Sequence, residues 1–239
     1  MDPRLFNVLF IDIETAAQFA SFEEVPERLK PHWERKASLL NKNEDFNASE
    51  VYNDKAAIYA EYGKVICVGV GGFYLNKSGE LSFKAQSIVR DTEKETLTEL
   101  AAVLSRHKAL EDLQLCAHNG REFDFPYLCR RMLINDIELP YALNLSGKKP
   151  WEVSHIDTLQ FWKFGDYKHF TSLDLLATLF DIPGSKSDIT GADVNRVYHE
   201  EGNVKRIAEY CVRDVVVLAR LFLKLKSLPE LKEENIHIA

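Results

Sequence analysis

A chain of 239 residues, 46% hydrophobic and 11% aromatic, is long enough to bury one sizeable core, most simply as a single α/β domain. A net charge of −7 argues against a protein that grips nucleic acid over its whole surface, although it allows a local basic rim around an acidic pocket. No stretch approaches the roughly 20 apolar residues of a membrane span, and the N-terminus lacks a cleavable secretory pattern, so we expect a cytoplasmic protein.

The first expected strand, "LFNVLFIDIET" at residues 5–15, carries two carboxylates, Asp12 and Glu14, at its far end. A strand points residues i and i+2 to the same face, so these two acids lie side by side, roughly 6–7 Å apart. At an effective dielectric constant near 20 the two charges repel by roughly 2–3 kcal/mol. A single acid here would be explained by a strand that ends at the surface, where the carboxylate is solvated. A pair of acids beside an apolar stretch instead indicates a cation site.

Residues 20–62 form a charged segment in which "ERLKPHWERKASLLN" and "SEVYNDKAAIYAEY" show helical spacing of apolar residues. This pattern predicts a helical insertion, or lid, after the first strand. Two β-branched runs follow at residues 64–75 and 81–89, joined through Asn76 to Gly79, and they predict a hairpin.

Helices and strands alternate through the rest of the chain. In order, we expect a helix over 93–107, a strand over 113–119, a helix that opens at Phe125-Pro126, and a long final helix over 203–225. Residues 227–239 are typical of a loosely held tail. The sequence therefore predicts one domain over residues 1–226 with this tail attached.

The final helix places an acid where an apolar residue is expected. At 100° per residue, Asp214 falls in the centre of the apolar face, flanked by Cys211 and Leu218. An unpaired carboxylate on a buried stripe would cost several kcal/mol, so solvation does not explain it. Tyr210 lies one turn earlier on the same stripe and reaches the same region, although a core tyrosine would look the same.

A third acid follows the strand over residues 113–119, in "AHNGREFDFPYL". Asp124 directly precedes the Phe125-Pro126 helix start, so its carboxylate is a candidate N-cap. Asp124 also lies near the carboxyl end of a strand, the edge at which open α/β sheets build their sites. Both roles stay open at this point.

The motifs "FIDIET", "NGREFD" and "YCVRD" occur in an order that resembles the DEDD superfamily of 3′–5′ exonucleases. The position of Tyr210, four residues before Asp214, resembles that of the tyrosine for which the tyrosine subfamily is named. The second motif, followed by "FPYL", looks most like the proofreading domain of family B DNA polymerases. The resemblance implies an RNase H-like mixed central sheet flanked by helices, here with a helical insertion after the first strand.

The resemblance also implies a site with two divalent cations, Mg²⁺ or Mn²⁺. By similarity, Asp12 would bridge both ions, Glu14 and Asp214 would complete the first site, and Asp124 would serve the second. Tyr210 would orient the attacking water, because a phenol is a poor base but a good positioning group.

The resemblance implies hydrolysis from the 3′ end of single-stranded DNA, with release of nucleoside monophosphates. The alternative is an exoribonuclease that trims RNA. Thr15 and Asn119 match positions that touch the terminal nucleotide in similar enzymes, and Ile13 or Phe123 would add apolar contact to the end bases. For Phe123 a core role is at least as well supported. Candidates for a phosphate rim are Arg121, Arg130, Arg131, Lys148, Lys149, Lys163 and Lys168.

Other functional classes fit the sequence less well. "DIET" resembles the DxDxT signature of haloacid dehalogenase-type phosphatases, but glutamate stands in the second acidic position. A non-catalytic nucleic-acid-binding subunit would not be expected to keep four acids and the tyrosine. The four cysteines form no CxxC pair, so they indicate reduced core residues rather than a zinc knuckle or a disulfide framework.

Overall fold

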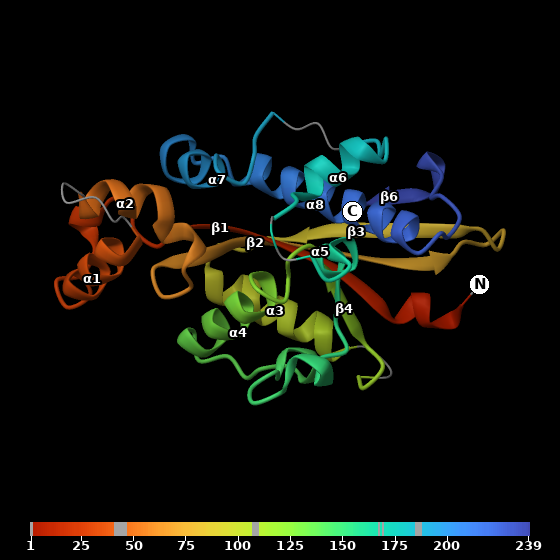
Figure 1. Ribbon diagram of the computed structural model, residues 1–239, viewed down its shortest axis with the longest axis horizontal. Coiled ribbons are helices and arrows are strands. Elements are labelled where there is room, and N and C mark those ends of the chain that lie inside the picture. The colour runs from red at the N-terminus through yellow and green to blue at the C-terminus, as the bar shows by residue number, and fades with distance from the viewer. Residues whose placement is uncertain (1, 41–46, 107–109, 167, 169, 185–187) are drawn as a thin grey trace.

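The computed structural model describes residues 2–40, 47–106, 110–166, 168, 170–184 and 188–239. A six-stranded sheet with the order β5-β4-β1-β2-β3-β6 lies between two helical layers (Figure 1). Strands β1 and β2, and β2 and β3, are antiparallel, whereas β1 and β4, β4 and β5, and β3 and β6 are parallel. The mixed sheet flanked by helices confirms the expected α/β fold. The strands are β1 (Val8–Ala17), β2 (Gly63–Leu75), β3 (Leu81–Ile88), β4 (Gln114–Ala117), β5 (Ile156–Asp157) and β6 (Ile236–Ile238).

The apolar run of β1 reflects burial on both faces of a central strand. On one face, the Phe10 ring lies 5.2 Å from Phe73 and 5.4 Å from Phe222, measured between ring centroids. On the other face, Ile11 and Ile13 belong to a second core cluster. Side chains on alternate positions of β1 therefore enter different cores, and Asp12 and Glu14 share one of the two faces.

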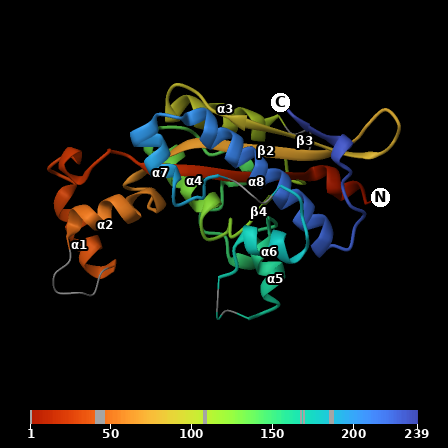
Figure 2. The same ribbon diagram turned by 90° about the horizontal axis from the view of Figure 1, so that it is seen from above.

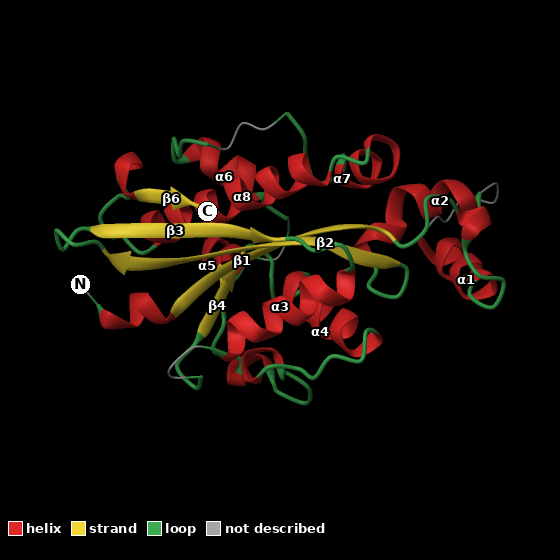
Figure 3. Ribbon diagram, turned by 180° about the vertical axis from the view of Figure 1, so that it is seen from behind, coloured by secondary structure: helices red, strands yellow, loops and turns green. Residues whose placement is uncertain are grey.

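Two helices cover one face of the sheet, and the last long helix crosses the other (Figures 2 and 3). The helix α3 opens with the capping box of Thr92 and Glu95. None of the helices in the described part of the chain is long and apolar enough to span a membrane. The α-helices are α1 (Lys30–Leu40), α2 (Ala48–Lys55), α3 (Glu93–Ser105), α4 (Asp124–Ile134), α5 (Thr158–Lys163), α6 (Leu173–Leu179), α7 (Val194–Arg196) and α8 (Val204–Leu225). Short 3-10 turns span Pro3–Asn7, Phe22–Glu24, Ala56–Ile58, Tyr141–Leu143, Pro150–Glu152 and Glu233–Asn235, and a π-helical turn spans Val197–Glu201.

The expected helices match this order, with small differences at their ends. The final helix spans 204–225, close to the expected 203–225. The helix expected over 93–107 ends at residue 105 in the structure, and residue 107 lies outside the described residues.

The segment 20–62 holds α1 and α2, which extend from one end of the sheet (Figure 1). Their core is built around Trp33, which is fully buried and packs edge-on against Tyr52 and Tyr62. The Trp33 indole N–H donates to the main-chain oxygen of Ala48 at 2.9 Å. This segment therefore carries a small core of its own that joins the sheet through Ala17 of β1.

The expectation of a loosely held C-terminal tail over 227–239 is wrong. Strand β6 pairs in parallel with β3, and the Ala239 N–H donates to the Ala85 oxygen at 3.0 Å. Leu231 is buried in the core cluster that contains Phe222 of α8. The outer edge of β3 would otherwise expose unpaired backbone groups, which this last strand satisfies. The packed structure therefore continues beyond residue 226.

Candidate active site

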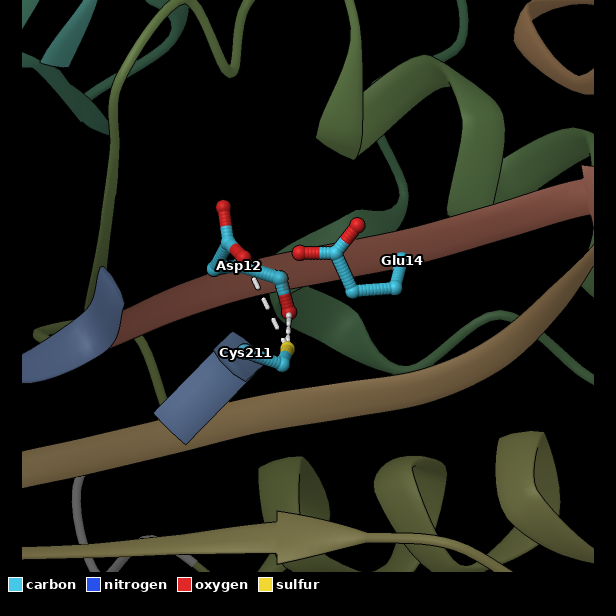
Figure 4. A group of neighbouring side chains, drawn as sticks. All are labelled: Asp12, Glu14 and Cys211. Carbon is cyan, nitrogen blue, oxygen red and sulfur yellow. Dashed lines mark hydrogen bonds between the residues drawn. The ribbon is translucent and has the colours of Figure 1, made fainter. Parts of the chain in front are cut away.

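Strand β1 presents two acids to the helix that crosses it. Asp12 stands opposite Gly69 of β2, and Glu14 stands opposite Cys67. Figure 4 shows the Asp12 and Glu14 side chains beside Cys211 of α8. One ligand atom from each of these three residues lies within 4.8 Å of the others. Glu14 is only 7% exposed, so its carboxylate is not explained as a solvated group at the end of a strand.

Helix α8 supplies the thiol and two further groups. The Cys211 sulfur lies 3.5 Å from both the main-chain oxygen and Oδ2 of Asp12, and either oxygen can accept a hydrogen bond from the thiol. The same sulfur accepts the Gly69 N–H at 3.1 Å. Tyr210 directly precedes Cys211, and its hydroxyl donates a hydrogen bond to the carboxylate of Asp214, one turn further along α8. The helix therefore brings a thiol, a phenol and a third carboxylate to the acids of β1.

Two glycines of β2 allow this close approach of α8. A Cβ at Gly69 would lie 2.7 Å from Cγ2 of Val215 and 3.0 Å from the sulfur of Cys211. A Cβ at Gly71 would lie 3.0 Å from Cγ1 of Val215 on α8, and 2.5 Å from the ring of Phe83 on β3. Side chains at these positions would push α8 away from the sheet, so the glycines fix the distance between Cys211 and Asp12.

We expect Gly69→Ala to destabilise the fold by about 1–3 kcal/mol, because the added methyl group overpacks the contact between β2 and α8. Thermal denaturation with and without Mn²⁺ measures this loss. Gly72→Ala is the matched control on the same strand, since a Cβ there meets only the Val8 oxygen at 3.8 Å. Equal melting temperatures for the two variants would contradict the packing argument.

The fourth acid, Asp124, is the first residue of α4 and is 3% exposed. Phe123 occupies the N-cap position, so of the two roles left open for Asp124 the structure excludes the N-cap. The Asp124 carboxylate instead accepts from the backbone N–H of Ile13, which ties it to β1 between the first two acids. The site thus joins β1, α4 and α8.

The loop before Asp124 is held by Asp157. Its carboxylate accepts the backbone N–H groups of Asn119 at 2.9 Å, Arg121 at 3.2 Å and Leu159 at 3.0 Å. His155 accepts from the Leu115 N–H and contacts the Ala142 oxygen. Asp157 and His155 therefore have structural roles, since their side chains bind the main chain of the segments around the site.

Burial is the largest influence on the pKa of each of the four acids, and the Arg213 charge only partly offsets it at Asp214. Burial raises the pKa of Asp124 to about 7 and that of Asp214 to about 6. For Asp12, burial and the charges of Asp124 and Asp214 raise the pKa well above its usual range, and burial with the Asp12 charge does the same for Glu14. Among the described residues, no lysine or arginine forms a salt bridge with these four acids.

This donor set fits divalent cations. Four carboxylates supply hard oxygen ligands, and bound cations would neutralise charges that otherwise repel. The Cys211 thiol contributes a hydrogen bond rather than a thiolate, because burial raises its pKa well above its usual range.

Comparison with known proteins assigns the family. Residues 60–236 match the model of a family described as a predicted 3′–5′ exonuclease related to the exonuclease domain of PolB. The chain belongs to this family. No curated protein matches the chain.

The fold of this PolB-related exonuclease family member also occurs in solved structures. The family B DNA polymerase from the hyperthermophilic archaeon Pyrobaculum calidifontis is 15% identical, with a TM-score of 0.51. The match covers 90% of this chain and 24% of that polymerase chain, so this chain spans about a quarter of the relative. The likeness supports the RNase H-like fold, and with the family match it confirms the resemblance to the proofreading exonuclease domain of family B DNA polymerases.

The residues expected to contact substrate in this PolB-related chain differ in their solvent exposure and in their hydrogen bonding. Ile13 packs in the core and is 5% exposed, and Thr15 is buried beside the hydroxyl of Tyr127. Phe123 is half-buried, with its ring 5.4 Å from that of Tyr127. Asn119 has a left-handed backbone, with φ of 64°, and its buried Oδ1 has no hydrogen-bond partner among the described residues. Only Asn119 offers a polar atom that still needs a partner.

One candidate for the phosphate rim is placed elsewhere by the structure. Arg131 is 3% exposed and forms a buried ion pair with Glu93 across α3 and α4. The predicted contact of Arg131 with phosphate is therefore wrong, because its guanidinium is already paired with the carboxylate of Glu93. Helical spacing places Arg131 on the inner face of α4, one residue from the exposed Arg130.

Sequence reasoning missed the contact of Cys211 with Asp12. The available signal was its position three residues before Asp214 on the same face of α8. Cysteine is so common in apolar cores that this position by itself indicates packing.

Proposed function

We propose that this chain is a metal-dependent 3′–5′ exonuclease that hydrolyses phosphodiester bonds at the 3′ end of single-stranded DNA and releases nucleoside monophosphates. The observation that carries the proposal is the convergence of four carboxylates with raised pKa values and no salt bridge to a lysine or arginine among the described residues, in a chain of the PolB-related family. Asp12, Glu14 and Asp214 would hold one divalent cation, and Asp12 with Asp124 would hold the second. The chemistry that Mg²⁺ or Mn²⁺ supplies in such a pair is stabilisation of the charge on the attacking and leaving oxygens.

Tyr210 would position the attacking water. Burial and the Asp214 charge raise its pKa, so the phenol stays protonated and does not act as a base. Because its hydroxyl is hydrogen-bonded to Asp214, a lone pair of the phenol oxygen remains to accept a hydrogen bond from the water. Asn119 would complete the substrate end of the site, where its unpartnered Oδ1 can accept a hydrogen bond from a hydroxyl of the terminal sugar.

The test compares linear and circular single strands of the same sequence, with Mn²⁺ and with EDTA. We expect the linear strand to shorten from its 3′ end only when metal is present, and the circle to survive. Rapid loss of the circle would indicate an endonuclease, and loss of neither strand would support a non-catalytic nucleic-acid-binding subunit. A parallel RNA strand compares the two substrate classes, and faster RNA hydrolysis would favour an exoribonuclease.

We expect Tyr210→Phe to lower the turnover number by roughly 10- to 1,000-fold, because the variant loses the hydroxyl that orients the water. The increase in melting temperature caused by Mn²⁺ should stay near that of the wild type, since the carboxylates remain. Tyr74→Phe, at an exposed tyrosine of β2, is the matched control. Wild-type turnover by Tyr210→Phe would remove this residue from the mechanism.

A further inference from the structure

A concave surface lies on the outer side of α4, away from the sheet. The helix and the segment that follows it enclose a groove of about 550 Å³, within the size range of ligand sites. Its apolar lining includes Phe125, Leu133 and Leu145, and Leu133 is 61% exposed. The wall is fixed by hydrogen bonds, since the Cys129 thiol donates to the Leu143 oxygen at 3.1 Å. The groove is thus a built feature of the fold.

The charges that line this groove all have one sign. Arg121, Arg130 and Lys148 line it, and no acidic side chain does so in the part of the chain that the structure describes, although the whole chain carries a net charge of −7. Arg121 is partly engaged, because its guanidinium donates to the main-chain oxygen of Val153 at 3.1 Å and to that of His155 at 2.7 Å. Arg130 and Lys148 are exposed and form no salt bridge within the described residues. The groove therefore suits a partner that is both anionic and partly apolar.

Exposed aromatic rings stand on the same segment. Trp151 is 77% exposed, with the Lys149 ammonium 5.3 Å from its ring centroid. Tyr141 is 54% exposed, with the Lys148 ammonium 5.7 Å from its ring centroid. Cations beside exposed aromatic faces form the surface on which single strands bind, with phosphates at the charges and bases stacked on the rings.

One end of the groove is lined by Arg121, which lies on the loop that precedes Asp124. Arg121 lies two residues after Asn119, and Phe125 directly follows Asp124. We propose that the groove and Trp151 bind the part of a nucleic acid strand that precedes its 3′-terminal nucleotide. Arg130 and Lys148 contact phosphates there, and Trp151 stacks on a base. The proposal rests on the proposed exonuclease function and assigns its substrate a binding surface beyond the cluster of acids.

The test measures binding of a labelled oligothymidine strand by fluorescence anisotropy in EDTA, so that no hydrolysis occurs. We expect Arg130→Gln/Lys148→Gln to weaken binding by about tenfold or more, and to reduce the slope of log K against log salt by about 0.7 for each lost phosphate contact. Lys77→Gln/Lys84→Gln makes the same change in net charge at exposed lysines of β3 and of the turn before it, and should bind as the wild type does. Trp151→Ala should weaken binding by about fivefold or more, with an unchanged salt slope.

Hydrolysis separates this proposal from the proposed function. In Mn²⁺, the groove variants should show a raised KM for the long strand, with a turnover number close to that of the wild type, because the acids are intact. If the wild type hydrolyses the strand and the double variant binds it with wild-type affinity, the groove does not hold nucleic acid and serves another partner, such as a protein. If the wild type binds the strand through the groove but hydrolyses nothing, the exonuclease function fails while the binding surface stands.

Discussion

Asp12→Asn is expected to lower the rate of 3′-end hydrolysis by about 1,000-fold or more, the largest effect of any single substitution in this chain. The charges of both Asp124 and Asp214 raise the pKa of Asp12, so its carboxylate lies near an acid of α4 and an acid of α8. A carboxylate in that position can serve both cations, whereas a neutral amide offers one weaker oxygen ligand to either. Turnover of a 5′-labelled strand at saturating Mn²⁺ measures the loss.

Asp136→Asn is the matched control for this substitution. Asp136 is exposed after the end of α4 and has a left-handed backbone, with φ of 56°, which asparagine also tolerates. The control should keep the activity of the wild type. An Asp12→Asn variant that retained a tenth of the wild-type rate would show that the acids of β1 do not form the reaction centre.

Asp124→Asn is expected to raise the melting temperature of the metal-free protein at pH 8. Burial raises the pKa of Asp124 in the folded chain to about 7, from an ordinary value of 3.8. Between these two values the folded chain holds a proton that the unfolded chain has lost, so stability falls as the pH rises toward 7 and the loss is complete above it. We expect an increase of several °C, since 1 kcal/mol shifts the melting temperature of such a chain by roughly 2–4 °C.

Two further conditions decide whether charge causes this effect. At pH 5 in EDTA the wild-type carboxyl is already protonated in the folded state, so the advantage of Asp124→Asn should shrink. In millimolar Mn²⁺ at pH 8 the order should reverse, because a ligand that binds only the folded state stabilises it and the variant has lost a ligand group. An equal gain from Mn²⁺ in both proteins would exclude Asp124 from the metal centre.

The sequence predicts those parts of the site that local periodicity determines. The i, i+2 spacing of Asp12 and Glu14 indicates a shared face of β1, and the 100° helical step indicates the stripe that carries Tyr210 and Asp214. These residues come together because the apolar surfaces around them require β1 and α8 to pack, as the contacts between the two elements show. Local patterns therefore predicted the acids and the strands and helices on which they lie.

Features that depend on contacts between distant segments were not predictable in this way. The hydrogen bond from Cys211 to Asp12 depends on how far α8 approaches Gly69, which neither segment specifies alone. The helix start suggested an N-cap role for Asp124, but its carboxylate accepts a hydrogen bond from the backbone N–H of Ile13 on a distant strand. Strand β6 at 236–238 was missed because a run of three residues carries almost no periodic signal and forms only on the exposed edge of β3.

An anomalous difference map from crystals grown with Mn²⁺ tests most directly whether the buried acids form a divalent metal centre. We predict anomalous peaks in contact with the carboxylate of Asp12, one of them shared with Glu14 and Asp214 and the other with Asp124. Both peaks should vanish in Asp12→Asn crystals grown under the same conditions. Mn²⁺ peaks found only at exposed acids elsewhere on the chain, with none at Asp12, would contradict the proposed metal centre and the exonuclease mechanism built on it.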